Sequence, residues 1–222
     1  SNTYDRNGFR YQFLKEVSKG ISFFVDGGKG INDNNSYFYL VKANSTLGYQ
    51  VWAAHQGAKT SQFLLKGQNL VSVPIVPSND DVTEVLQTLN FSVAWFYDPL
   101  DALDPWKSYN PLKSYNDLTT VNHTMGIWVD VVSDSYLMTA GHVPESTDIP
   151  LYAGWNLIGY PSFKEKTVAK ALSAVPYERV ECFDASFPPE KLRLYNDGDV
   201  LRTGYGFWVK LSSDATLTIK QI

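Results

Sequence analysis

The sequence predicts a mainly β protein in which an amino-terminal segment is followed by two tandem β-rich repeats, each with one short helix. Three observations support this fold class. Aromatic residues make up 14% of the 222 residues, and their flat rings pack well on pleated sheets. One series of motifs occurs twice along the chain. Helical periodicity is confined to one short stretch in each copy of that series.

The duplication begins with residues 65–74 (LKGQNLVSVP), which return as residues 152–161 (YAGWNLIGYP). An apolar stripe at i, i+3, i+4 and i+7 follows in each copy and predicts a short amphipathic helix. Its residues are Val82, Val85, Leu86 and Leu89 in the first copy and Val168, Ala171, Leu172 and Val175 in the second. Asp80 or Asp81 and Thr167 are suitable N-caps for these helices.

Three predicted strands complete each copy. Residues 93–98 correspond to 180–184, residues 125–129 (MGIWV) to 205–209 (YGFWV), and residues 136–139 to 215–219. Gly126 and Gly206 are expected where the backbone turns or approaches a neighbour closely. Trp128 and Trp208, which alternate with apolar neighbours, are expected to be structural anchors in the core, with ligand stacking as the alternative.

The chain therefore divides into residues 1–62, residues 63–147 as the first repeat and residues 148–222 as the second. Within the first segment, residues 23–26 predict a strand that enters a glycine turn. Residues 37–44 (YFYLVKAN) predict a strand that is apolar on both faces. Residues 56–62 are expected to be a polar linker into the first repeat.

Composition and motifs argue against several functional classes. The net charge is −4 and Lys and Arg are scattered along the chain, so no nucleic-acid-binding surface is predicted. No apolar run reaches the roughly 18–20 residues that a membrane span needs. His55, His123 and His142 lack metal-ligand spacing, and nucleophile-elbow, P-loop and dinucleotide motifs are absent. We therefore expect a non-catalytic protein without a cofactor.

Two groups of acidic and amide residues have oxygen atoms that suit calcium. Asp98, Asp101 and Asp104 are spaced by three in a loop, and a second group, Asp26, Asn32 and Asp33, flanks another turn. Ordinary turn chemistry accounts for Asp and Asn at such positions without an ion. Turn formation is the favoured interpretation, and calcium is the alternative.

The sequence also contains four glycosylation sequons and one cysteine. The sequons begin at Asn34, Asn44, Asn90 and Asn122, all in or beside predicted turns where a glycan can be carried. If the protein is exported, we expect some of them to be modified. Cys182 lies in an apolar stretch, which favours a buried, unreactive thiol.

The amino-terminal segment resembles the end of a fibronectin type III domain. The resemblance rests on residues 24–26 (FVD), on the Tyr-rich run Tyr37-x-Tyr39-x-Val41-x-Ala43-Asn44, and on Gly48, since in that family a Tyr-rich strand precedes the final hairpin. A complete domain of this family has about 90–100 residues and seven strands. We therefore expect either that the early strands have been cleaved or truncated, with the upstream piece still attached, or that a partner supplies them by β-augmentation. The first alternative is favoured.

The two later copies resemble a repeat found in large archaeal and some bacterial surface proteins. The matching residues are 154–158 (GWNLI) and 204–209 (GYGFWV) in the second copy, and 104–111 (DPWKSYNP) and 116–120 (NDLTT) in the first. Gln68 and Met125 depart from the pattern, since the second copy has Trp155 and Tyr205 there. The resemblance implies an extracellular or cell-surface location and specifies architecture rather than chemistry.

These observations predict a structural or adhesive module of a surface assembly, with protein partners or further copies of the chain. One alternative is a carbohydrate-binding module in which exposed rings, such as Trp106 and Tyr109, stack on sugars. Another is an accessory domain of a larger surface protease or hydrolase.

Overall fold

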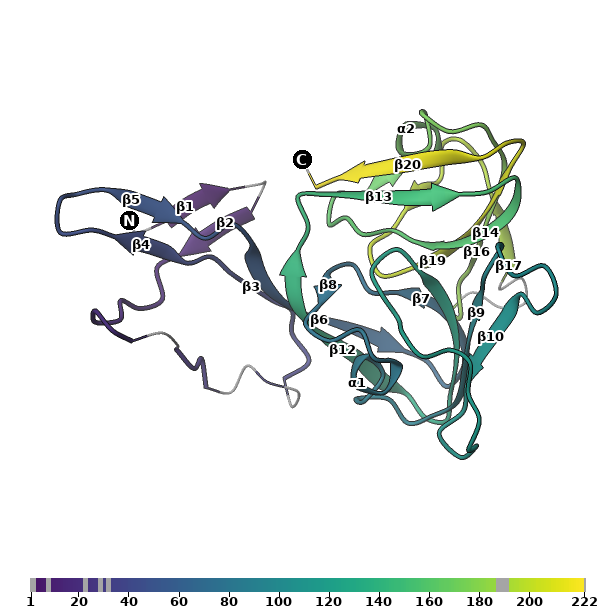
Figure 1. Ribbon diagram of the computed structural model, residues 1–222, viewed down its shortest axis with the longest axis horizontal. Helices are drawn as coiled ribbons and strands as arrows, with labels where there is room; N and C mark the ends of the chain where they lie inside the picture. The colour runs from purple at the N-terminus through teal and green to yellow at the C-terminus, as the bar shows by residue number, and fades with distance from the viewer. Residues whose placement is uncertain are drawn as a thin grey trace.

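The computed structural model describes residues 3–6, 9–21, 24–27, 30, 33–186 and 192–221. This part of the chain is mainly β, with many short antiparallel strands and two helices of four residues (Figure 1). Neither of these helices has the length and hydropathy needed to cross a membrane. The predicted mainly β fold is therefore confirmed, and the two short helices lie within the two stretches whose periodicity predicted a helix.

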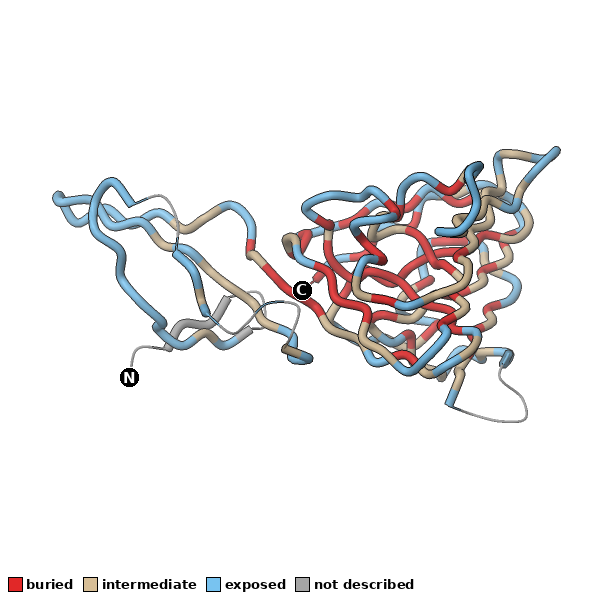
Figure 2. The backbone as a smooth tube through the Cα atoms, turned by 90° about the horizontal axis from the view of Figure 1, so that it is seen from below, coloured by how far each residue is buried: buried red, intermediate tan, exposed pale blue. Residues whose placement is uncertain are grey.

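The amino-terminal segment extends away from a compact body (Figures 1 and 2). Strands β1 (Thr3–Arg6) and β2 (Phe9–Gln12) pair only with each other among the described strands. A long, interrupted hairpin follows: β3 (Tyr37–Tyr39) pairs with β6 (Gln56–Leu64), and β4 (Lys42–Asn44) pairs with β5 (Gln50–Trp52). The predicted strand over residues 37–44 is thus two strands. Within the described residues the segment forms hairpins and no closed sandwich.

Two sequence expectations for this segment differ from the structure. Residues 24–26 are not in a strand, and Phe23, which was grouped with them, lies outside the described residues. Residues 56–62, expected as a linker, belong to β6, which lies between β3 and β12 (Ser135–Val143). The strand therefore crosses the boundary that the sequence placed between residues 62 and 63. The polar sequence of these residues did not indicate a buried strand. Lys59, for example, is buried because its ammonium donates to the carbonyl oxygens of Asp33 and Asn35.

The two halves of the body have similar orders of elements, and among the described residues the second half contains one strand more than the first. The first half contains β6, β7 (Gly67–Ser72), β8 (Val76–Pro77), α1 (Val82–Val85), β9 (Phe91–Tyr97), β10 (Trp106–Tyr109), β11 (Gly126–Val131) and β12. The second contains β13 (Ser146–Leu151), β14 (Gly154–Gly159), β15 (Lys166–Thr167), α2 (Val168–Ala171), β16 (Tyr177–Phe183), β17 (Leu192–Tyr195), β18 (Val200–Leu201), β19 (Gly206–Leu211) and β20 (Ala215–Lys220). Asp81 and Thr167 are the N-caps of the two helices, at positions expected from the sequence.

The main sheets of the two halves have equivalent strand orders. The first is β10-β9-β11-β7, and the second, taken from the matching edge, is β17-β16-β19-β14. Both contain a β-bulge at the same place, where the register of the strand pair skips Ser92 in β9 and Glu178 in β16. Each bulged residue contacts the strand beside it: the Ser92 hydroxyl donates to Asp130 at 2.7 Å, and Lys210 donates to Glu178 at 2.8 Å.

The repeated Gly-x-Asn motif forms the turn that begins β7 and β14. Gly67 and Gly154 have φ values of 94° and 93°, a left-handed conformation that favours glycine. The Asn69 amide donates to the carbonyl oxygens of Leu65 and Gly67, and Asn156 makes the corresponding two bonds in the second half. The motif therefore forms the same turn in both halves.

Each half has its own apolar core between its main sheet and its outer strands. In the first half, the α1 stripe residues pack with the inward side chains of β11, Ile127, Val129 and Val131. In the second, Val168 and Leu172 pack with Phe207, Val209 and Leu211 of β19. Burial of these side chains is the main favourable term for each half.

The two main sheets also contact each other, and the contacts are reciprocal. The Ser72 amide donates to the Gly204 carbonyl at 2.8 Å, while the equivalent Gly159 amide donates to the Thr124 carbonyl at 2.8 Å. Isolated bridges join Val71 to Tyr205 and, correspondingly, Met125 to Ile158. A third cluster, Leu70, Leu157 and Phe183, is buried between the halves. The halves are therefore joined as if around a twofold axis rather than strung as separate beads.

Candidate functional site

The paired tryptophans lie at the junction between the halves. Strand alternation sends Ile127 and Val129 into the core of their own half, so Trp128 faces the opposite half. Its ring packs edge-on against Phe183 at 4.8 Å, and Trp208 packs in the equivalent way against Tyr97 at 5.2 Å. Both rings are half-buried, so the anchors join the two halves instead of filling either core.

Gly126 and Gly206 allow the backbones of the halves to approach at this junction. A β-carbon on Gly126 would lie 2.6 Å from the Ile158 carbonyl oxygen, and one on Gly206 would lie 2.9 Å from a methyl carbon of Leu70. Both distances are too short for a real side chain. These glycines therefore act through close approach, one of the two roles expected from the sequence.

An aromatic cluster continues from Trp208 to the surface. Trp106 lies 5.4 Å from Tyr97 and 5.7 Å from Trp208, and Trp155 lies 6.1 Å from Trp208. The ring of Trp106 is 44% exposed. On the other side of the junction the equivalent positions hold Leu192 and Gln68, so the cluster is specific to one side.

A shallow hollow of about 590 Å³ lies beside Trp106. Asp104, Tyr115 and Asp117 contribute to its wall together with Trp106. The hollow therefore combines exposed rings with charged hydrogen-bonding groups. Tyr109, the other predicted stacking residue, is half-buried against the first core near Phe91, because residues three apart in a strand point to opposite faces.

The calcium candidates contact a lysine. Lys107 donates to Asp101 at 2.6 Å and lies 3.8 Å from Asp104, while Asp98 accepts the backbone amide of Leu100. The hydrogen bond from Lys107 lowers the pKa of Asp101. No group of three or more His, Cys, Asp or Glu residues in the described part of the chain is arranged to hold a metal. Of the second candidate group, Asn32 is outside the described residues, while Asp26 and Asp33 accept the hydroxyls of Tyr39 and Tyr37.

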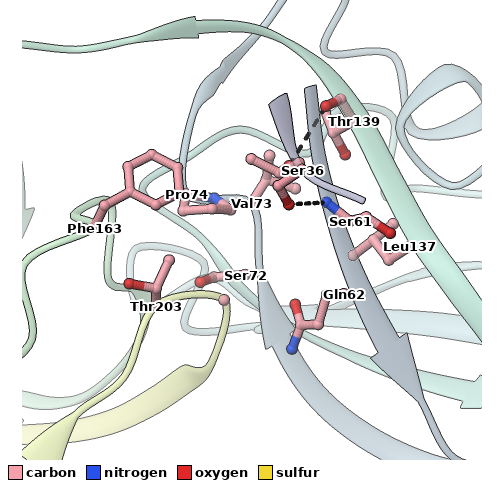
Figure 3. Close-up of a pocket in the computed structure, with 12 residues that line it drawn as sticks. Ser36, Ser61, Gln62, Ser72, Val73, Pro74, Leu137, Thr139, Phe163 and Thr203 are labelled. Atoms are coloured by element: carbon pink, nitrogen blue, oxygen red, sulfur yellow. Dashed lines mark hydrogen bonds between the residues drawn. The ribbon is translucent and has the colours of Figure 1, made fainter. Parts of the chain in front are cut away.

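A small cavity of about 130 Å³ lies where the amino-terminal segment meets both halves (Figure 3). Ser36 comes from the segment, Gln62 and Ser72 from the first half, and Phe163 and Thr203 from the second. The Ser36 hydroxyl accepts the Ser61 amide at 2.9 Å. The volume is below the roughly 300–1,000 Å³ of typical organic-ligand pockets and suits ordered water.

Three of the four sequon asparagines are exposed. Asn34, Asn44 and Asn90 lie at turns or strand ends on the surface, whereas Asn122 is half-buried. The Asn122 side-chain oxygen accepts both the amide and the hydroxyl of Thr124, its own sequon residue. The first three positions can carry a glycan without rearrangement.

The remaining titratable groups are structural. Cys182 is buried, as predicted, and burial raises the pKa of its thiol to about 12. The rings of His55 and His142 lie 4.6 Å apart, a proximity that their separation in sequence did not indicate. Burial, and then His55, lowers the pKa of His142. Burial likewise lowers the pKa of His123, with a smaller contribution from His142.

The projecting β4–β5 hairpin also leaves apolar side chains uncovered, and the sequence did not single it out. Its exposed residues are Val41, Leu47, Tyr49 and Val51, each between 66% and 82% exposed. No Asp, Glu, Lys or Arg occurs between Lys42 and Lys59. That long uncharged run was the available sequence signal for this surface.

The chain matches no protein-family model, no curated protein and no solved structure.

Proposed function

We propose that this chain is a non-catalytic structural or adhesive module of an extracellular or cell-surface assembly. The amino-terminal segment would belong to a fibronectin type III-like unit, and the two halves of the body would be tandem surface repeats of archaeal or bacterial type. The element order and the reciprocal junction support a duplication. Three exposed sequons suit an exported protein, in which glycans on the surface are tolerated.

The observation that carries the proposal is the uncovered apolar face of the β4–β5 hairpin. Soluble monomers rarely leave a contiguous apolar patch of more than a few hundred Å² exposed, and such patches mark interaction sites. Exposed strands without charged residues also tend to pair with other chains. A module whose task is to contact neighbours accounts for this face, whereas an isolated globular domain does not.

Electron microscopy of the protein purified from the cells that make it tests the proposal. Filaments, a lattice or a defined larger particle are the expected result, and dispersed monomers would contradict it. Val51→Lys places a charge on the apolar face and is expected to reduce the assembled fraction in sedimentation. Gln50→Lys places the same charge on the opposite face of the hairpin and is the matched control.

The second candidate function is carbohydrate binding, favoured by the exposed ring of Trp106 above the hollow with Asp104 and Asp117. Aromatic rings stack on the apolar faces of sugars, while carboxylates accept hydrogen bonds from hydroxyls. Trp106→Ala is expected to abolish retention on a glycan array while the far-UV circular dichroism of the folded protein is unchanged. Tyr49→Ala, which removes another exposed ring, is the control, and absence of binding by the unmodified protein would exclude this function.

A further inference from the structure

The exposed apolar side chains are concentrated at the two opposite ends of the molecule. Of the 19 large apolar side chains exposed in the described residues, six lie in residues 13–25, four lie on the β4–β5 hairpin and seven lie at or beside β9, β10 and β17. Figure 1 places these strands at one end of the long axis and the β4–β5 hairpin at the other, and Figure 2 shows the same extended shape. Only Phe63 and Val132 belong to neither group.

The first end presents a flat apolar face built from cross-strand pairs. Ala43 lies opposite Val51, and Val41 is joined to Ala53 by a backbone hydrogen bond of 2.8 Å, so these residues share one face of the hairpin. Trp52 lies on the other face, where the ammonium of Lys42 is 5.1 Å from its ring. The apolar face therefore lacks charge, and its partner must supply apolar contacts.

The second end presents an apolar patch on two loops of the first half. We call this the end patch; it consists of Leu100, Leu103, Trp106, Leu112 and Tyr115, which are between 44% and 99% exposed. Trp106, Leu112 and Tyr115 all border the hollow described above. Three of the five apolar residues therefore share one hollow, whose remaining wall is polar and includes Asp104 and Asp117.

The charges at the two ends are opposite in sign. Residues 41–53, which include the β4–β5 hairpin, contain one Lys and no Arg, Asp or Glu, a net charge of +1. Residues 98–117, which include the end patch, contain four Asp and two Lys, a net charge of −2. Contact between unlike ends is thus favoured electrostatically, while contact between like ends is not.

We propose that the β4–β5 hairpin of one copy docks its apolar face on the end patch of the next copy, head to tail. The inference rests on the proposed function and names its partner as a second copy of this chain. A symmetric contact between two hairpins would leave both end patches uncovered, and a contact between two end patches would leave both hairpins uncovered. Only the head-to-tail arrangement covers both surfaces. Such a heterologous contact repeats from copy to copy and builds a ring or an open filament.

Disulfide trapping tests this arrangement, because the native Cys182 is buried and unreactive. Val51→Cys and Leu112→Cys place single thiols on the hairpin face and the end patch, and both positions are exposed enough to leave folding unchanged. Under mild oxidation, mixing the two variants is expected to give about tenfold more mixed disulfide dimer than mixing Gln50→Cys with Leu112→Cys. A chain that carries both Val51→Cys and Leu112→Cys is expected to give a ladder of covalent oligomers.

The other outcomes overturn the inference in distinguishable ways. Mainly Val51→Cys homodimers would indicate hairpin-to-hairpin contact. Yields no higher than with Gln50→Cys would show that a second copy does not dock there. In that case, larger native particles in the electron microscope would leave the proposed function standing with a different partner, and native monomers would overturn both. Retention on a glycan array without cross-linking would make a sugar the occupant of the end patch.

Discussion

Replacement of Gly126 by Ala is expected to destabilise the protein at the junction between its halves. The added carbon would lie 2.6 Å from the Ile158 carbonyl oxygen and 3.2 Å from the Gly206 α-carbon, and both are backbone atoms that cannot rotate away. Overpacking of this kind costs about 1–3 kcal/mol. The lower conformational freedom of Ala in the unfolded chain returns roughly 0.5–1 kcal/mol. We therefore expect a net loss of about 1–2 kcal/mol in the free energy of unfolding.

Urea unfolding followed by tryptophan fluorescence measures this loss from the shift of the midpoint at constant slope. Gly57→Ala is the control, because a β-carbon there would meet its nearest neighbour at an ordinary 3.8 Å. Gly206→Ala is expected to fall between the two, since its nearest neighbour is the end of the Leu70 side chain. If Gly126→Ala matches Gly57→Ala, the close approach of the halves is not what the structure indicates.

Two further predictions concern the helix caps and pH. Asp81→Ala is expected to lower the urea midpoint, because the carboxylate accepts the Thr83 amide at 2.8 Å, whereas Thr167→Ala should lower it less since its side chain makes no cap bond. Stability is expected to fall as the pH is lowered below 6.5, because burial keeps the pKa of His142 lower in the folded protein than the ordinary 6.5 and the unfolded chain therefore binds more protons. Thermal unfolding at several pH values should show a shallower slope for His142→Gln, and an unchanged slope would contradict this assignment.

Local sequence signals predicted much of the body. The alternating strands and the apolar helix stripes each have a local physical cause, so their positions in both halves could be derived, whereas the turn formed by the duplicated Gly-x-Asn motif is seen only in the structure. Strand β6 could not be derived, because its polar residues are satisfied by distant partners, such as the carbonyl oxygens that bind Lys59. Alternation showed that Trp128 faces away from Val129, but only the fold reveals that another half covers it.

The candidate surfaces were predictable in part. Trp106 was predicted to be exposed, and it is. Tyr109 was predicted to be exposed beside it, whereas strand β10 puts the two rings on opposite faces. The apolar face of the β4–β5 hairpin was missed because an alternating strand normally has its apolar side covered, and sequence alone does not show when that cover is lacking.

The reciprocal contacts between the halves have a consequence for how the protein tolerates dilution and change. A twofold dimer held by the same contacts would dissociate at low concentration, but here residues 144–145 tether the two partners, and their encounter is intramolecular. The contacts between the halves therefore do not depend on the protein concentration. Because the two halves belong to one chain, their sequences can also differ. One side of the junction has Trp106 and Trp155, while the equivalent positions on the other side are Leu192 and Gln68. The two sides of the molecule can therefore differ even though the backbone contacts that join the halves are symmetric.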